Sequence, residues 1–206
     1  MPAQTSVGLA CSPRKGGNTE ILLNRAVETL QSENIATEIF RLADMRYSPC
    51  MACGGCNTTG RCVIKDDAGA VYEKILKADI LILAAPIFSM GLCAHAKMFI
   101  DRAQQFWATR YLLGMPVVED EQLRRSRRGI FISCAGTNLE GVFDGAIRVV
   151  RYFYKMLDIR LEGTRCYPGI DKKGEILSNT GALDQIRDVS LKLASFSPSG
   201  REKTGG

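Results

Sequence analysis

Short apolar runs alternate with longer segments of helical periodicity along this chain, a pattern typical of a parallel sheet covered by helices. The apolar runs predict five strands, at residues 6–10, 36–41, 80–85, 129–133 and 160–166. The segments between and after them predict five helices, at residues 19–31, 67–77, 94–107, 142–157 and 183–193. Five strand–helix units in 206 residues indicate an α/β fold with one doubly wound, five-stranded parallel sheet.

The expected strand order, 2-1-3-4-5, is flavodoxin-like, and it places a ligand at the carboxyl ends of strands one and three. The loop after strand one, residues 11–19, reads C-S-P-R-K-G-G-N-T and runs into a helix N-terminus. Backbone N–H groups and the helix dipole favour an anion there. This predicts a phosphate site formed by Ser12, Arg14, Gly17, Asn18 and Thr19. The alternative is an ordinary helix N-cap at Asn18 or Thr19.

The loops after strands three and four lie at the same edge of the expected sheet. Small and apolar residues after strand three predict a platform for a flat ring, formed by Pro86, Ile87, Phe88, Ser89, Met90 and Gly91. The other side of the ring would be covered by Ser133, Cys134, Ala135 and Gly136. The chain contains neither G-x-x-x-x-G-K-[ST] nor G-x-G-x-x-G, which argues against a P-loop NTPase and against a Rossmann dinucleotide site. A mononucleotide therefore fits these loops better than a dinucleotide.

Four cysteines with the spacing C-x2-C-x2-C-x5-C occupy a loop at residues 48–65. They are Cys50, Cys53, Cys56 and Cys62, and glycines lie between them. A four-iron cubane needs thiolates that converge from several directions, and glycines allow the chain to wrap closely around it. The spacing therefore predicts a [4Fe-4S] cluster held by this loop.

Other interpretations of the cysteine loop remain open. Four thiolates also suit zinc, although structural zinc sites usually separate two C-x2-C pairs by a dozen or more residues. Disulfides among Cys50, Cys53 and Cys56 would be strained by their proximity. The simplest alternative is a loop whose thiols only pack.

Composition predicts one domain over residues 1–196, followed by a polar, Gly-rich tail at 197–206 that we expect to be disordered. The formal net charge of +5 fits affinity for a phosphorylated cofactor or an acidic electron-transfer partner, and nothing in the pattern indicates nucleic-acid binding. The apolar runs are too short to span a membrane. Eight cysteines without an export signal favour the cytoplasm.

Two motifs carry a resemblance to a known family. The pattern S-P-R-x-x-G-N-T matches residues 12–19, and P-x-[YF] followed by K-x-F-x-D-R matches Pro86, Phe88, Lys97, Phe99, Asp101 and Arg102. With the cysteine loop between them, the chain resembles the NAD(P)H-dependent FMN reductase family and its iron-sulfur flavoprotein branch. It departs at Phe88, where tyrosine is usual. The resemblance implies noncovalent FMN, with its phosphate on residues 12–19 and its isoalloxazine against residues 86–91 and 133–137, in a homodimer or homotetramer.

The resulting hypothesis is an iron-sulfur flavoprotein that passes electrons between ferredoxin or NAD(P)H and a small acceptor through a [4Fe-4S] cluster and FMN. The chemistry is centred on the flavin, so no catalytic side chain is assigned. One alternative is a cluster-free NAD(P)H-dependent FMN or quinone reductase, and another is a non-enzymatic carrier or zinc-stapled interaction module. The basic run at residues 124–128 is interpreted as a solvated loop, and His95 as a helix-start residue.

Overall fold

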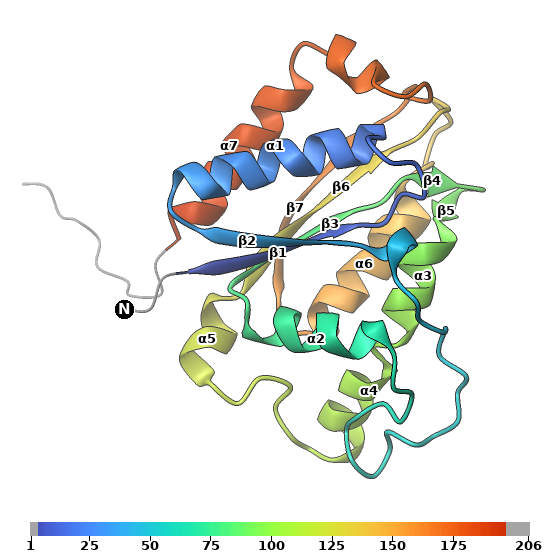
Figure 1. Cartoon of the computed structure of the whole chain (residues 1–206), viewed down its shortest axis with the longest axis vertical. Helices are drawn as coiled ribbons and strands as arrows, with labels where there is room; N and C mark the ends of the chain where they lie inside the picture. Colours follow the sequence, from blue (N-terminus) through green and yellow to red (C-terminus); the bar gives the residue numbers. More distant parts are fainter. Residues whose placement is uncertain (1–3, 197–206) are drawn as a thin grey trace, which may run out of the picture.

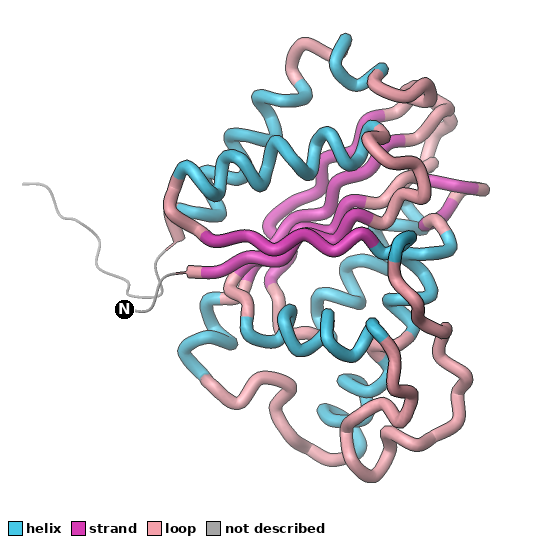
Figure 2. Tube along the Cα trace, in the orientation of Figure 1, coloured by secondary structure: helices cyan, strands magenta, loops and turns pink. Residues whose placement is uncertain are grey.

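The computed structural model describes residues 4–196, and its centre is a five-stranded parallel sheet (Figure 2). The strands are β1 (Thr5–Ala10), β2 (Ala36–Arg41), β3 (Ile80–Ala84), β6 (Arg128–Cys134) and β7 (Arg160–Tyr167), in the order β2-β1-β3-β6-β7. In chain order these are strands 2-1-3-4-5, so the predicted flavodoxin-like sheet is confirmed. The predicted tail at 197–206 lies outside the described residues.

Helices cover both faces of the sheet (Figure 1). One face carries α1 (Asn18–Ser32) and α7 (Ala182–Ala194), whose buried residues pack in one apolar cluster with β3 and β6. The other carries α2 (Asp67–Lys77), α3 (Ala94–Asp101) and α6 (Asp144–Met156), which share a second apolar cluster. All residues of β3 and β6 are buried, as expected for central strands of a parallel sheet. No helix within residues 4–196 is long and apolar enough to cross a membrane.

The predicted helix at 94–107 is interrupted, and that prediction is wrong in its detail. The chain forms α3, then α4 (Gln104–Trp107), then the π-helical turn η2 (Ala108–Leu112). At the break the N–H of Arg102 donates to Phe99 O at 3.0 Å and the N–H of Ala103 to Ile100 O at 2.9 Å, which is the tighter i→i−3 pattern. Phe99, Ala103 and Phe106 stay buried on both sides of the break, so the apolar periodicity continues through it.

Five further short elements were not predicted. The hairpin of β4 (Ile87–Phe88) and β5 (Gly91–Leu92) interrupts the ring-platform loop, with positive φ at both turn residues, Ser89 and Met90. The others are the 3₁₀ turns η1 (Leu42–Asp44) and η3 (Glu175–Ser178), and α5 (Glu121–Ser126), which is capped by Asp120.

The interpretation of residues 124–128 as a solvated loop is wrong for Arg127 and Arg128, which are 2% and 1% exposed. The Arg127 guanidinium donates to Ala78 O at 3.1 Å and also to the carbonyls of Ile75 and Leu157. Arg128 donates to Leu193 O at 2.7 Å. Ile75 and Leu193 lie in the last turns of α2 and α7, and Ala78 and Leu157 are the C-caps of α2 and α6. The two arginines therefore donate hydrogen bonds to carbonyls at three helix ends.

Candidate functional site

Four loops meet in a cavity of about 160 Å³ at the carboxyl edge of the sheet. The cavity is lined by Ser12, Pro13, Arg14, Gly17, Asn18, Thr19, Pro86, Ile87, Phe88, Cys134, Gly136, Ile170 and Asp171. All five predicted phosphate-site residues are among them. Of the predicted ring-site residues, Ser89, Met90, Gly91, Ser133 and Ala135 do not line the cavity within the described chain.

The loop before α1 is shaped to receive an anion. The Ser12 hydroxyl accepts from the Arg14 N–H at 3.1 Å, which folds the loop back toward the helix. Gly17 is the N-cap of α1, so the N–H groups of Asn18 and Thr19 belong to the first helical turn, whose amides lack helical acceptors. The cap is therefore Gly17, and the alternative of an N-cap at Asn18 or Thr19 is not what the structure has. These backbone groups, with the nearby Arg14, suit a phosphate.

A fourth loop, after β7, completes the cavity and was missed from the sequence. Arg14 Nη1 donates to Asp171 O at 2.8 Å. The Asn18 side chain donates to Lys172 O at 2.9 Å and accepts from the Ile176 N–H at 3.3 Å. Asn18 therefore braces this loop with its side chain. The available signal was that strand five must end at the same sheet edge as strands one and three.

The ring-platform side of the cavity is formed by the start of the β4–β5 hairpin. Ile87 pairs with Leu92 and Phe88 with Gly91, and the Phe88 side chain is half exposed while it lines the cavity. Across the cavity, burial raises the pKa of the Cys134 thiol to about 12. The thiol is therefore neutral at physiological pH, which makes it a poor nucleophile.

The four cysteines of the 48–65 loop line a second cavity, of about 400 Å³. Burial raises the pKa of the Cys56 thiol, and the neighbouring thiols of Cys62, Cys50 and Cys53 raise it further. Among residues 4–196, no three His, Cys, Asp or Glu side chains are grouped closely enough to hold one metal ion. A four-iron cluster places each thiolate on a different iron atom, so its ligands surround a wider space than those of a single ion. The shared cavity and the all-thiol donor set fit such a cluster.

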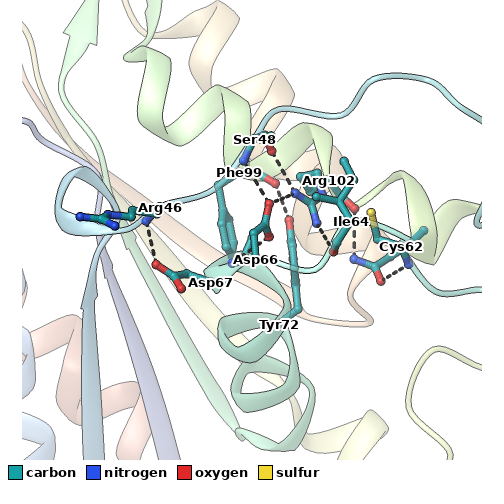
Figure 3. A network of polar contacts seen from close by, with 11 residues as sticks. Arg46, Ser48, Cys62, Ile64, Asp66, Asp67, Tyr72, Phe99 and Arg102 are labelled. Carbon is teal, nitrogen blue, oxygen red and sulfur yellow. Dashed lines mark hydrogen bonds and ion pairs between the residues drawn. The ribbon is translucent and has the colours of Figure 1, made fainter.

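Arg102 joins the two ends of the cysteine loop, and Figure 3 shows it between Asp66 on one side and Cys62 on the other. Its Nη1 donates to Ser48 O at 2.9 Å and to Asp66 Oδ2 at 2.7 Å, and its Nη2 donates to Ile64 O at 3.3 Å. Although burial alone would lower it, the pKa of Arg102 is raised by its hydrogen bond to Asp66 and by the charges of Cys62 and Asp66. The guanidinium is therefore a permanent buried cation beside the cysteine cavity.

Two more residues of the same helical face hold the cysteine loop. Gln105 Oε1 accepts from the Cys62 N–H at 3.1 Å, and Thr109 Oγ1 donates to Gly60 O at 3.1 Å. Gly60 has φ +66°, and a Cβ there would lie 2.5 Å from Thr109 Oγ1, so glycine is required for this approach. Arg102, Gln105 and Thr109 follow i, i+3, i+7 spacing, which places them on one face of the interrupted helix.

The comparison with known proteins decides the family. A family model described as NADPH-dependent FMN reductase matches residues 5–144. The chain belongs to this family. The part matched by the FMN reductase model contains the phosphate loop, the cysteine loop and the hairpin, whereas Ile170 and Asp171 lie beyond it.

Individual relatives point to one branch of the FMN reductase family. The chain is 38% identical to an iron-sulfur flavoprotein of Methanocaldococcus jannaschii over 98 residues, which are 48% of this chain and 51% of that protein. It is 29% identical to an iron-sulfur flavoprotein of Archaeoglobus fulgidus over 148 residues, 72% of this chain and 70% of that protein. The chain spans about half the length of the iron-sulfur flavoproteins that it matches at 33% to 38% identity.

The solved structure of an NAD(P)H:quinone oxidoreductase from Methanothermobacter marburgensis shares the fold. It covers 95% of this chain and 98% of its own, with a TM-score of 0.69 and 16% identity.

Proposed function

We propose that this protein is a flavin-dependent oxidoreductase with two cofactors. FMN binds noncovalently in the cavity at the sheet edge, and a [4Fe-4S] cluster binds to Cys50, Cys53, Cys56 and Cys62. Electrons pass between NAD(P)H or a ferredoxin and a small acceptor such as oxygen, peroxide or a quinone. The observation that supports this most directly is that four thiols line one cavity, while a second cavity is lined by the loop before α1, which is suited to a phosphate.

FMN, when bound, exchanges a hydride or single electrons, whereas the cluster exchanges single electrons only. Arg14 and the first amides of α1 would hold the FMN phosphate, and Pro86, Ile87 and Phe88 would support the ring. The neutral Cys134 thiol avoids repelling an electron-rich ring. Proton transfer is not assigned to a side chain of this cavity.

The second candidate is a cluster-free NAD(P)H-dependent FMN or quinone reductase. It is supported by the contacts of Arg102, Gln105 and Thr109, which hold the cysteine loop through protein atoms alone. In that case the cysteine loop is only packed against α3 and α4. As family resemblance implies, we also propose a homodimer or homotetramer, which light scattering would test.

The proposal is tested by measuring iron, acid-labile sulfide, zinc and FMN per protomer in anaerobically purified protein. We expect four iron, four sulfide and one FMN. Cys56→Ser should lose iron and keep FMN, because the two cavities are lined by different residues of the described chain. Cys166→Ser, a thiol of β7 outside both cavities, is the matched control and should keep both cofactors. FMN without iron would leave the cluster-free reductase, and stoichiometric zinc without turnover would identify the zinc-stapled module.

A further inference from the structure

Arg102 has one donor that the protein does not use. Its side chain is 1% exposed, and its Nη atoms donate to Ser48, Ile64 and Asp66. Its Nε is buried and has no hydrogen-bond partner among residues 4–196. Leaving a buried donor unpaired is unfavourable, most of all on a charged group, so this unpaired N–H requires an explanation.

The location of Arg102 explains why its Nε–H has no partner within the protein. Its side chain and the Cys62 thiol line the same cavity, which is the cavity that holds all four cysteines. Figure 3 shows the Cys62 sulfur on the side of Arg102 that faces away from Asp66. A sulfur that carried the charge of a cluster ligand would be an acceptor for the unused N–H.

Other cations near the loop do not share this position. Arg46, Arg61 and Lys65 flank the cysteines in sequence, but all three are exposed. Charges in water are screened, whereas a buried charge acts through a lower effective dielectric. Asp101 also lines the cavity, but its carboxylate is paired with Lys97 at 2.8 Å at the surface. Arg102 is therefore the charged group of the described chain best placed to act on a ligand sulfur.

We propose that Arg102 is a positioning residue for the cluster: its Nε–H donates to the Cys62 sulfur of the bound cluster and raises the cluster's reduction potential, while its Nη atoms hold the ends of the loop. Cluster potentials rise when nearby positive charge and hydrogen bonds to sulfur stabilise the reduced, more negative state. The proposal rests on the cluster of the proposed function. It makes Arg102 the residue that sets the cluster potential independently of the flavin potential.

The test is an EPR-monitored redox titration of the anaerobic holoprotein, compared with Arg102→Gln, Arg102→Lys and Arg61→Gln. Arg102→Gln should shift the cluster midpoint downward, and Arg102→Lys should shift it less because the charge is kept. Arg61→Gln removes an exposed cation of the same loop and should leave the midpoint unchanged. The FMN midpoints of the same samples should not move in any variant, which makes them an internal control. Resonance Raman should show changed Fe–S(Cys) stretching bands only in the Arg102 variants.

Arg102→Gln also changes the contacts that the Nη atoms make with Ser48, Ile64 and Asp66, so Asp66→Asn provides an independent measurement. Asparagine can still cap α2, but it removes the negative charge that opposes the guanidinium, and the cluster midpoint should rise. Unchanged cluster midpoints in Arg102 variants that retain full iron, or an equal shift in Arg61→Gln, would overturn the inference and leave the proposed function intact. An unchanged midpoint in Asp66→Asn would count against it in the same way. Wild-type protein without iron would instead remove the cluster from the proposed function, and this inference with it.

Discussion

The Arg102 guanidinium and the Asp66 carboxylate form a buried ion pair, 2.7 Å apart, between the end of α3 and the N-cap of α2. Asp66 also accepts from the Ser48 N–H at 3.0 Å and from the Ala68 N–H at 3.2 Å. One carboxylate thus joins the start of the cysteine loop, its end and the following helix. The two ends of the cysteine loop are therefore held together by contacts between protein atoms alone.

Removing one partner of this pair should destabilise the fold. Asp66→Ala leaves the buried Arg102 cation without its counter-charge, and we expect a loss of about 3 kcal/mol in the free energy of unfolding by urea denaturation. Lys97→Ala is the matched control, because it removes an exposed ion pair from the same helix and should cost less than about 1 kcal/mol. Equal losses in the two variants would show that the Arg102–Asp66 pair stabilises the fold no more than an exposed ion pair does.

The same pair should make the stability depend on acid. Burial opposes ionisation of Asp66, yet the hydrogen bonds from Arg102 and Ser48 hold its pKa below the ordinary value. A carboxyl whose folded pKa is depressed stabilises the fold above its unfolded pKa, near 4, and this contribution disappears as the pH falls through the folded pKa. Urea midpoints measured from pH 6 to pH 2 should therefore fall more steeply for the wild type than for Asp66→Asn. Parallel curves would contradict this role of Asp66.

The fold was largely predictable from the sequence because each strand of the sheet is locally encoded. The run I-L-I-L-A of β3 is buried throughout, and the apolar faces of α1 and α6 follow helical spacing. The break after Asp101 was not predictable, because periodicity reports which face is buried and not whether a hydrogen bond spans three or four residues. Burial of Arg127 depends on carbonyls 30 to 52 residues away, which no local pattern shows.

The candidate site was also predictable from the sequence only in part. The phosphate loop was found because its hydroxyls, glycines and cation are consecutive. Asp171 was missed because it reaches the cavity through a hydrogen bond from Arg14, 157 residues away. Arg102 was recognised as part of a motif, but its partner Asp66 and its place beside Cys62 required the tertiary structure.

Gly129 should tolerate no side chain. A Cβ at this position would lie 2.0 Å from Leu81 O, in the centre of the sheet, so backbone would have to move. We expect Gly129→Ala to lower the free energy of unfolding by about 3 kcal/mol or more. Gly69→Ala, in α2, meets nothing within 4 Å and should stabilise the protein by up to about 1 kcal/mol. Thermal unfolding of both variants would check the pair, and a stable Gly129→Ala would contradict the close approach of β3 and β6.

Cys134 should make the protein sensitive to alkali. Its thiol has a pKa raised to about 12 by burial, against an ordinary value near 9. A group with a raised folded pKa stabilises the fold below its unfolded pKa, and this contribution is lost as the pH rises from about 9 toward 12. Cys134→Ala should therefore flatten the fall in stability between pH 9 and pH 11, measured as urea midpoints. The same slope in variant and wild type would exclude Cys134 as a source of the alkaline sensitivity.

Arg14 should contribute directly to FMN affinity if the phosphate occupies the start of α1. A charge-assisted hydrogen bond is worth about 1.5–3 kcal/mol, so Arg14→Ala should weaken FMN binding by roughly 10- to 100-fold. Lys15→Ala is the matched control, since its side chain is largely exposed and pairs with Asp44 at the surface. Titration of apoprotein with FMN, followed by quenching of flavin fluorescence, gives both dissociation constants.

Arg14 also holds Asp171 through a backbone carbonyl, so riboflavin, which lacks the phosphate, serves as a second ligand. A loss of affinity equal for FMN and riboflavin would mean that Arg14 only supports the loop after β7, whereas a loss confined to FMN would assign the guanidinium to the phosphate.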